Sequence, residues 1–147
     1  MQTLAMKIPP NTYAMVLDLA TKLTDARERD DTAQFWEHYN DLRKFCELQE
    51  ADGLGHPFLW ETLADYTDDN SAAIALYEKA LKATETATGT EYRGSIQFAL
   101  AERHRAMGND DLAYQYALAA NGTAKNLDDL QLRRAISEFL LNEAKRD

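Results

Sequence analysis

Apolar side chains recur at every third or fourth position along almost the whole chain, the spacing of one face of an α-helix. The first such run extends from about residue 12 to residue 27 and carries Tyr13, Val16, Leu17, Ala20 and Leu23. Six further runs of the same kind follow, and no segment gives a strong strand signal. The pattern therefore predicts seven helices.

Glycine, proline and capping residues divide these runs into pairs. Gly53 and Gly55 end the second run, Pro57 suits the first turn of the third, and Gly108 ends the fifth. Asn126 is expected to cap the last helix. The expected organisation is one domain, residues 1–147, with antiparallel hairpins at about 12–52, 57–83 and 91–120 and a capping helix at about 127–144.

Composition strengthens the prediction of a helical protein. Alanine and leucine together account for 42 residues, whereas valine and isoleucine account for 5. Alanine and leucine favour helices, while β-branched residues favour strands. The chain has 147 residues, with only 6 glycines and 3 prolines, which is the length of one domain with a sizeable core. We therefore expect an all-α fold.

Adjacent aspartates precede three of the predicted helices, as Asp30-Asp31, Asp68-Asp69 and Asp110-Asp111. One interpretation is an acidic ladder or a cation site. We favour N-capping, because aspartate accepts hydrogen bonds from free backbone N–H groups and complements the helix dipole. None of the pairs has the glycine and the distal glutamate of a calcium loop.

Alanine recurs at intervals of 40 residues, at Ala33, Ala73 and Ala113, each about one turn into the second helix of a hairpin. A small side chain at this place lets two antiparallel helices approach closely. The resulting hairpin still has an apolar face that only the next hairpin covers. Units stacked at a fixed period are typical of an α-solenoid.

The segment from Gly94 to Ala120 resembles a tetratricopeptide repeat. Leu100-Ala101 falls at that family's Leu-Gly pair, Gly108 at its turn glycine and Ala113 at its small residue, while His104 replaces the usual tyrosine. The preceding unit matches both halves of the pattern, through Trp60, Leu63, Ala64, Ala73, Ile74, Tyr77, Ala80 and Leu81. The resemblance implies a short, tetratricopeptide-like α-solenoid of about three hairpins, closed by the last helix as a cap.

Tetratricopeptide repeats generally bind peptides or protein elements in a concave groove lined by the first helix of each hairpin. The resemblance places ten residues in this groove: Met15, Asp18, Lys22, Asp25, Phe58, Glu61, Asp65, Phe98, Glu102 and Arg105. The implied groove is acidic and contains two phenylalanines. One subgroup clamps a C-terminal carboxylate with lysine and asparagine. Because Asp18, Glu61 and Asp65 hold those positions here, we do not expect that function.

Negative charge is concentrated in one part of the chain. The net charge is −9, and residues 37–69 contain nine acidic and two basic side chains. This segment is either a solvated face or a docking patch for a basic partner, in which Trp36, Glu37 and Asp41 are candidate contacts. Trp36 lies beside an apolar stripe and could be an exposed anchor, whereas Trp60 is expected in the core. The charge disfavours nucleic acid and anionic lipid as partners.

No motif for catalysis or for cofactor or metal binding is found. His38, His56 and His104 are far apart in the sequence, and Glu37 with His38 is not expected to put two ligands on one helical face. The single cysteine, Cys46, allows no intramolecular disulfide and is expected to be a small buried hydrophobe. We therefore predict no catalytic residue, no cofactor and no metal ligand.

The sequence favours a protein-binding module that is not an enzyme. The first ten residues lack the features of a signal peptide, so we expect a cytoplasmic protein. The leading hypothesis is an immunity or inhibitor protein that neutralises a basic toxin. The alternatives are a secretion chaperone or adaptor that holds an extended segment in the groove, and an enzyme with a carboxylate site there. Self-association through an open solenoid end is a further possibility.

Overall fold

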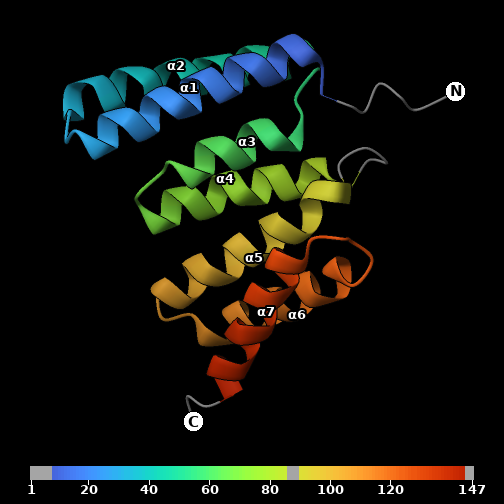
Figure 1. The fold of residues 1–147 in the computed structure, drawn as a ribbon. Coiled ribbons are helices and arrows are strands. Elements are labelled where there is room, and N and C mark those ends of the chain that lie inside the picture. Colours follow the sequence, from blue (N-terminus) through green and yellow to red (C-terminus); the bar gives the residue numbers. More distant parts are fainter. Residues whose placement is uncertain (1–7, 86–89, 145–147) are drawn as a thin grey trace, which may run out of the picture.

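The computed structural model describes residues 8–85 and 90–144, and in these ranges the chain forms seven α-helices and no strand (Figure 1). The helices are α1 (Pro10–Glu28), α2 (Thr32–Ala51), α3 (Pro57–Asp65), α4 (Asn70–Ala83), α5 (Thr90–Ala106), α6 (Asp110–Ala124) and α7 (Leu130–Ala144). The all-α prediction is confirmed. None of the described helices is long and apolar enough to cross a membrane.

The first six helices follow one another as three pairs. α1 packs against α2, α3 against α4 and α5 against α6, and the chain reverses direction within each pair (Figure 1). Consecutive pairs are in contact, and α3 also touches both α1 and α5. The first helices of the pairs therefore form one continuous surface. α7 packs against α6 at the C-terminal end of the stack.

Two of the three aspartate pairs supply a side-chain cap at the start of a helix. The Asp31 side chain accepts a hydrogen bond from the backbone N–H of Gln34, and Asp69 accepts one from that of Ala72. These contacts confirm the capping interpretation for α2 and α4. At α6 the cap position belongs to Asn109, and Asp110-Asp111 lies in the first turn, where negative charge complements the helix dipole.

The prediction for the start of the last helix was wrong. α7 begins at Leu130, and the carboxylate of Asp129, rather than Asn126, accepts the backbone N–H of Leu132. The buried residues of α7 are Ile136 and Phe139. Both follow Asp129 in the chain, so the apolar face of the helix begins after this cap. Leu127 lies in the segment before the helix, where its side chain approaches Gly94 of α5.

The 40-residue alanine spacing does not mark three equivalent packing positions. Ala73 and Ala113 are completely buried, as expected for close helix approach, but Ala33 is exposed. On α2 the core face is carried by Phe35, Leu42 and Cys46. Ala33 precedes Phe35 by two residues, which turns it to the opposite side of the helix.

Leucine and isoleucine side chains from successive pairs form the core. The largest fully buried ones include Leu23, Leu42, Leu59, Leu63, Ile96, Leu100 and Ile136, which come from α1, α2, α3, α5 and α7. Trp60 is also buried, as predicted, and the ammonium group of Lys79 lies 4.5 Å from its ring centroid. Burial of such apolar surface is the main force that holds the pairs together.

Cys46 is buried and carries no disulfide, as expected for a small hydrophobe. Its Sγ lies 3.4 Å from the carbonyl oxygen of Leu59, and burial, reinforced by Glu47, raises the pKa of the thiol to about 12. The thiolate is the reactive form of cysteine. Cys46 is therefore a packing residue that joins α2 to α3.

Candidate acidic binding site

A hollow of about 570 Å³ opens between α3, α5 and the segment that leads into α7. We call it the acidic pocket. Its lining is Phe58, Glu61, Thr62, Asp65, Glu91, Tyr92, Ser95, Leu127, Asp128, Asp129 and Leu132. Five of these residues carry a carboxylate, and none of them is lysine, arginine or histidine. The volume lies in the range of small-ligand sites in proteins.

Glu61 is the most strongly perturbed carboxyl group of the pocket. It projects from α3 opposite α5, where the hydroxyl of Ser95 donates a hydrogen bond of 2.6 Å to its Oε2. Burial is the main cause that raises the pKa of Glu61, the Ser95 hydrogen bond lowers it and the nearby Asp65 raises it, and the net value is about 7. Glu61 therefore changes its charge near neutral pH.

Asp65 lies one turn further along α3, on the same face as Glu61. Its Oδ1 accepts a hydrogen bond from the Tyr77 hydroxyl of α4. Although the residue is exposed by area, surrounding protein raises the pKa of its carboxyl group, and Tyr77 and Arg103 oppose this shift. Both carboxylates of α3 are thus held in place by a hydroxyl donor from a neighbouring helix.

Aromatic rings form one wall of the pocket. The Phe58 and Tyr92 ring centroids are 5.8 Å apart, in a tilted arrangement. Behind them, Tyr13 of α1 approaches Phe58 at 5.3 Å, and His56 meets Tyr92 edge to face at 5.1 Å. The cluster joins three first helices or their N-terminal ends, and it fixes Phe58 and Tyr92 beside the carboxylates.

The structure brings together three of the residues expected in the groove, namely Phe58, Glu61 and Asp65. The α1 residues lie elsewhere. Lys22 forms an exposed ion pair of 3.0 Å with Asp18. Asp25 lines a separate hollow of about 230 Å³ beside Tyr66.

The expected α5 residues are partly covered by the last helix. The Phe98 ring meets Phe139 of α7 edge to face at 5.6 Å. The guanidinium group of Arg105 lies 3.9 Å from the centre of the same Phe139 ring. Glu102 is exposed by area, yet desolvation by the surrounding protein raises the pKa of its carboxyl group, and Arg105 and Arg103 oppose this shift. Phe98 and Arg105, which were expected to line the groove, are therefore used to pack α7 on α5.

Trp36 of α2 is exposed, with 51% of its surface accessible. Its ring meets those of Phe35 and Tyr39 edge to face. Together with Phe35, Arg27 and Asp68 it borders a hollow of about 160 Å³ at the far end of the molecule from α7. Trp36 is thus outside the core, but it belongs to a surface distinct from the acidic pocket.

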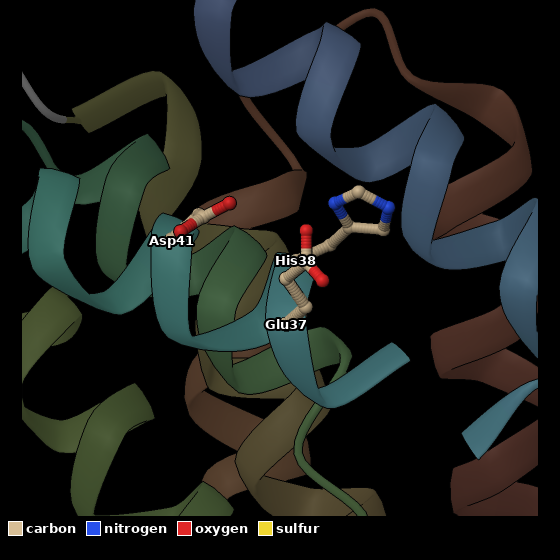
Figure 2. Close-up of side chains that lie close together, drawn as sticks. All are labelled: Glu37, His38 and Asp41. Carbon is tan, nitrogen blue, oxygen red and sulfur yellow. The ribbon is translucent and has the colours of Figure 1, made fainter. Parts of the chain in front are cut away.

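The other two candidates on α2, Glu37 and Asp41, cluster with His38 (Figure 2). One potential ligand atom of each residue lies within 4.8 Å of those of the other two, so Glu37 and His38 do bring ligand atoms together although they were not expected to present two ligands on one helical face. Asp41 is one turn from both Glu37 and His38 and therefore brings the group together. The imidazole points toward α1, and its Nε2 lies 3.3 Å from Oε1 of Gln34. Both carboxylates are exposed.

Several pocket residues escaped the sequence analysis. Ser95, Tyr92 and Glu91 lie on the first turns of α5, and Asp128 and Asp129 precede α7. The spacing of Glu91 and Ser95, four residues apart, would place them on one helical face. No sequence signal shows that the segment before α7 lies opposite α3, because this proximity depends on how α7 docks.

Comparison of the chain with protein-family models, with curated proteins and with solved structures gave no match. The site and its charge are therefore the basis for a functional proposal.

Proposed function

We propose that this protein is a non-enzymatic, tetratricopeptide-like binding module that recognises a basic protein partner through the acidic pocket. The observation that carries the proposal is the charge of the lining: five carboxylates face one hollow, and no basic side chain lines it. Gathering like charges in a concave surface costs free energy in the free protein. A positively charged partner removes this cost and is also attracted from a distance.

The leading form of this proposal is an immunity or inhibitor protein that covers a folded, basic toxin. A net charge of −9 on a 147-residue chain supports fast electrostatic association with such a partner. The alternative is a secretion chaperone or adaptor that holds an extended segment in the repeat groove. An inhibitor binds its folded partner with a strongly salt-dependent association rate, whereas a chaperone that binds mainly through apolar contacts is far less sensitive to salt.

The test uses the product of the neighbouring gene as the candidate partner, in folded and unfolded form. Association rate and affinity are measured by surface plasmon resonance at low and high salt. We expect the double variant Glu91→Gln/Asp128→Asn to slow association with a folded basic partner about tenfold at low salt. The matched control is Glu28→Gln/Asp111→Asn, which removes the same charge from exposed positions outside the pocket. Equal slowing by both double variants would contradict docking at the pocket.

An enzyme is the second candidate, because Glu61 and Asp65 form a pair of carboxyl groups whose pKa values are raised by burial. Such pairs serve as acid and base in hydrolases. Glu102 of α5 lies outside the pocket lining, but Asp65 is near enough to contribute to the raised pKa of its carboxyl group. Replacing Glu61 and Glu102 together by glutamine would abolish turnover in an enzyme but only weaken binding in a docking protein. Saturable turnover of a glycoside or ester panel that disappears in this variant would favour the enzyme.

A further inference from the structure

The acidic pocket combines apolar and negatively charged surface. Phe58 and Tyr92 supply aromatic faces, and Leu127 and Leu132 supply aliphatic contacts, whereas the carboxylates supply negative charge. Lysine and arginine side chains have the matching construction, with an apolar stem and a cationic head. Aromatic faces also attract a cation directly through the ring quadrupole.

The two α3 carboxylates are pre-organised to accept hydrogen bonds from a cationic ligand. Ser95 occupies Oε2 of Glu61, and Tyr77 occupies Oδ1 of Asp65. A carboxylate has about four lone-pair positions, so each group keeps acceptor sites beyond the one used here. Because neighbouring helices already fix both groups, a ligand loses less free energy in ordering them.

Basic side chains near the pocket are engaged elsewhere. Arg103 donates to the carbonyl oxygens of Ala64 and Asp68 and to the side chain of Asn70, outside the lining. Arg93 donates to the Thr84 hydroxyl. Arg103 offsets part of the charge of Asp65, but the hydrogen bonds of both arginines go to groups outside the pocket lining.

We infer that the acidic pocket receives a single lysine or arginine side chain of the partner, with its stem against Phe58 and Tyr92 and its charged head at Glu61 and Asp65. This inference rests on the proposed function, since it names the group by which the partner is recognised. It also gives the aromatic wall a role, which is to contact the apolar stem of the basic side chain.

Binding of this side chain is coupled to proton release. The groups that face Glu61 are Asp65 on its own helix, Ser95, Tyr92 and Glu91 on α5, and Asp128 and Asp129 before α7. With a pKa of about 7, Glu61 carries a proton on most molecules below neutral pH, and a cation must displace it. Affinity is therefore expected to rise about tenfold between pH 6 and pH 8, as the ionised fraction of Glu61 increases.

The experiment uses a peptide with one lysine between glycines, blocked at both ends, and the same peptide with acetyl-lysine. Amide shifts of the ¹⁵N-labelled full chain are followed by NMR during titration. We expect the lysine peptide, and its arginine counterpart, to shift the amides of Tyr92 and Ser95. The acetyl-lysine peptide should leave them unchanged, because it keeps the stem and lacks the charge.

Two variants test the two halves of the pocket. Phe58→Leu removes the ring but keeps apolar volume, and Glu61→Gln removes the charge but keeps an acceptor for Ser95. Each should weaken binding of the lysine peptide about two- to tenfold, since one cation–aromatic or carboxylate contact contributes about 0.5–1.4 kcal/mol. Glu47→Gln, at an exposed position of α2, is the control and should have no effect. Circular dichroism verifies that each variant is folded.

Three results would overturn the inference. The first is an equal response to acetyl-lysine, and the second is a shift pattern confined to residues 37–52. The third is tighter binding of spermidine than of the lysine peptide at the same amides, which would assign the pocket to a free polyamine. If the lysine peptide fails while the double variant Glu91→Gln/Asp128→Asn still slows a basic protein, the proposed function stands without this inference. If both fail, neither stands.

Discussion

Individual carboxyl groups of this protein differ sharply in their surroundings although the sequence shows them only as a uniform acidic excess. Glu61 is packed between α3 and α5 and accepts a hydrogen bond from Ser95, whereas Glu47 on α2 is exposed. The first lines the acidic pocket, where its negative charge costs free energy in the folded protein. The second contributes to solubility.

We expect Glu61→Gln to stabilise the protein at alkaline pH. Because folding raises the pKa of Glu61 from 4.5 to about 7, the native state binds a proton more tightly than the unfolded state, and stability falls as pH rises through this window. At about pH 8 the variant should gain about 1–3 kcal/mol, since each pKa unit corresponds to about 1.4 kcal/mol.

At about pH 4.5 the difference between Glu61→Gln and the wild type should shrink to less than about 0.5 kcal/mol, because the wild-type carboxyl group is then largely protonated when folded. Urea unfolding at both pH values provides the measurement, with Glu47→Gln as the matched control. A gain of the same size at both pH values would show that Glu61 is not desolvated.

At the scale of elements, helix starts are set by single side chains. Asp69→Ala should cost about 1 kcal/mol, because it removes the acceptor for the backbone N–H of Ala72 at the start of α4. Asp111→Ala, in the first turn of α6, removes only a favourable charge and should cost less than about 0.5 kcal/mol. Chemical denaturation compares the two, and equal costs would argue against a capping role for Asp69.

Helix existence was predictable from the sequence because apolar periodicity and helix breakers agree along the chain. Gly108, for example, adopts a positive φ of 81° where the fifth helix was expected to end. The start of α7 was not predictable, since Asn126 and Asp129 are both good caps and only docking selects between them. The prediction of a buried Ala33 was wrong because a fixed interval along the chain does not determine which face of a helix is buried.

The candidate site was predictable only where it lies on one helix. Phe58, Glu61 and Asp65 share one face of α3, and helical spacing alone places them together. Phe98 has the same kind of spacing on α5, yet α7 packs on it. Contacts between helices far apart in the chain depend on packing that a sequence pattern does not encode.

At the scale of the whole molecule, α7 decides how much of the surface of α5 and α6 is covered. Its Phe139 is buried against α5 and α6, so Phe139→Ala should cost about 3–4 kcal/mol and release the Phe98 and Arg105 side chains. Leu141→Ala, two residues on, removes a side chain that is 61% exposed and should cost less than about 0.5 kcal/mol. Thermal unfolding measures both, and equal losses would show that α7 does not dock through Phe139.

The same docking also sets the edge of the acidic pocket, because Asp128, Asp129 and Leu132 belong to the entry into α7. Local unfolding of α7 therefore removes one wall of the pocket. By thermodynamic linkage, any occupant of the pocket suppresses this opening in proportion to the logarithm of its concentration. Amide hydrogen exchange in the last helix thus becomes a sensor of pocket occupancy, even though most of that helix never touches the occupant.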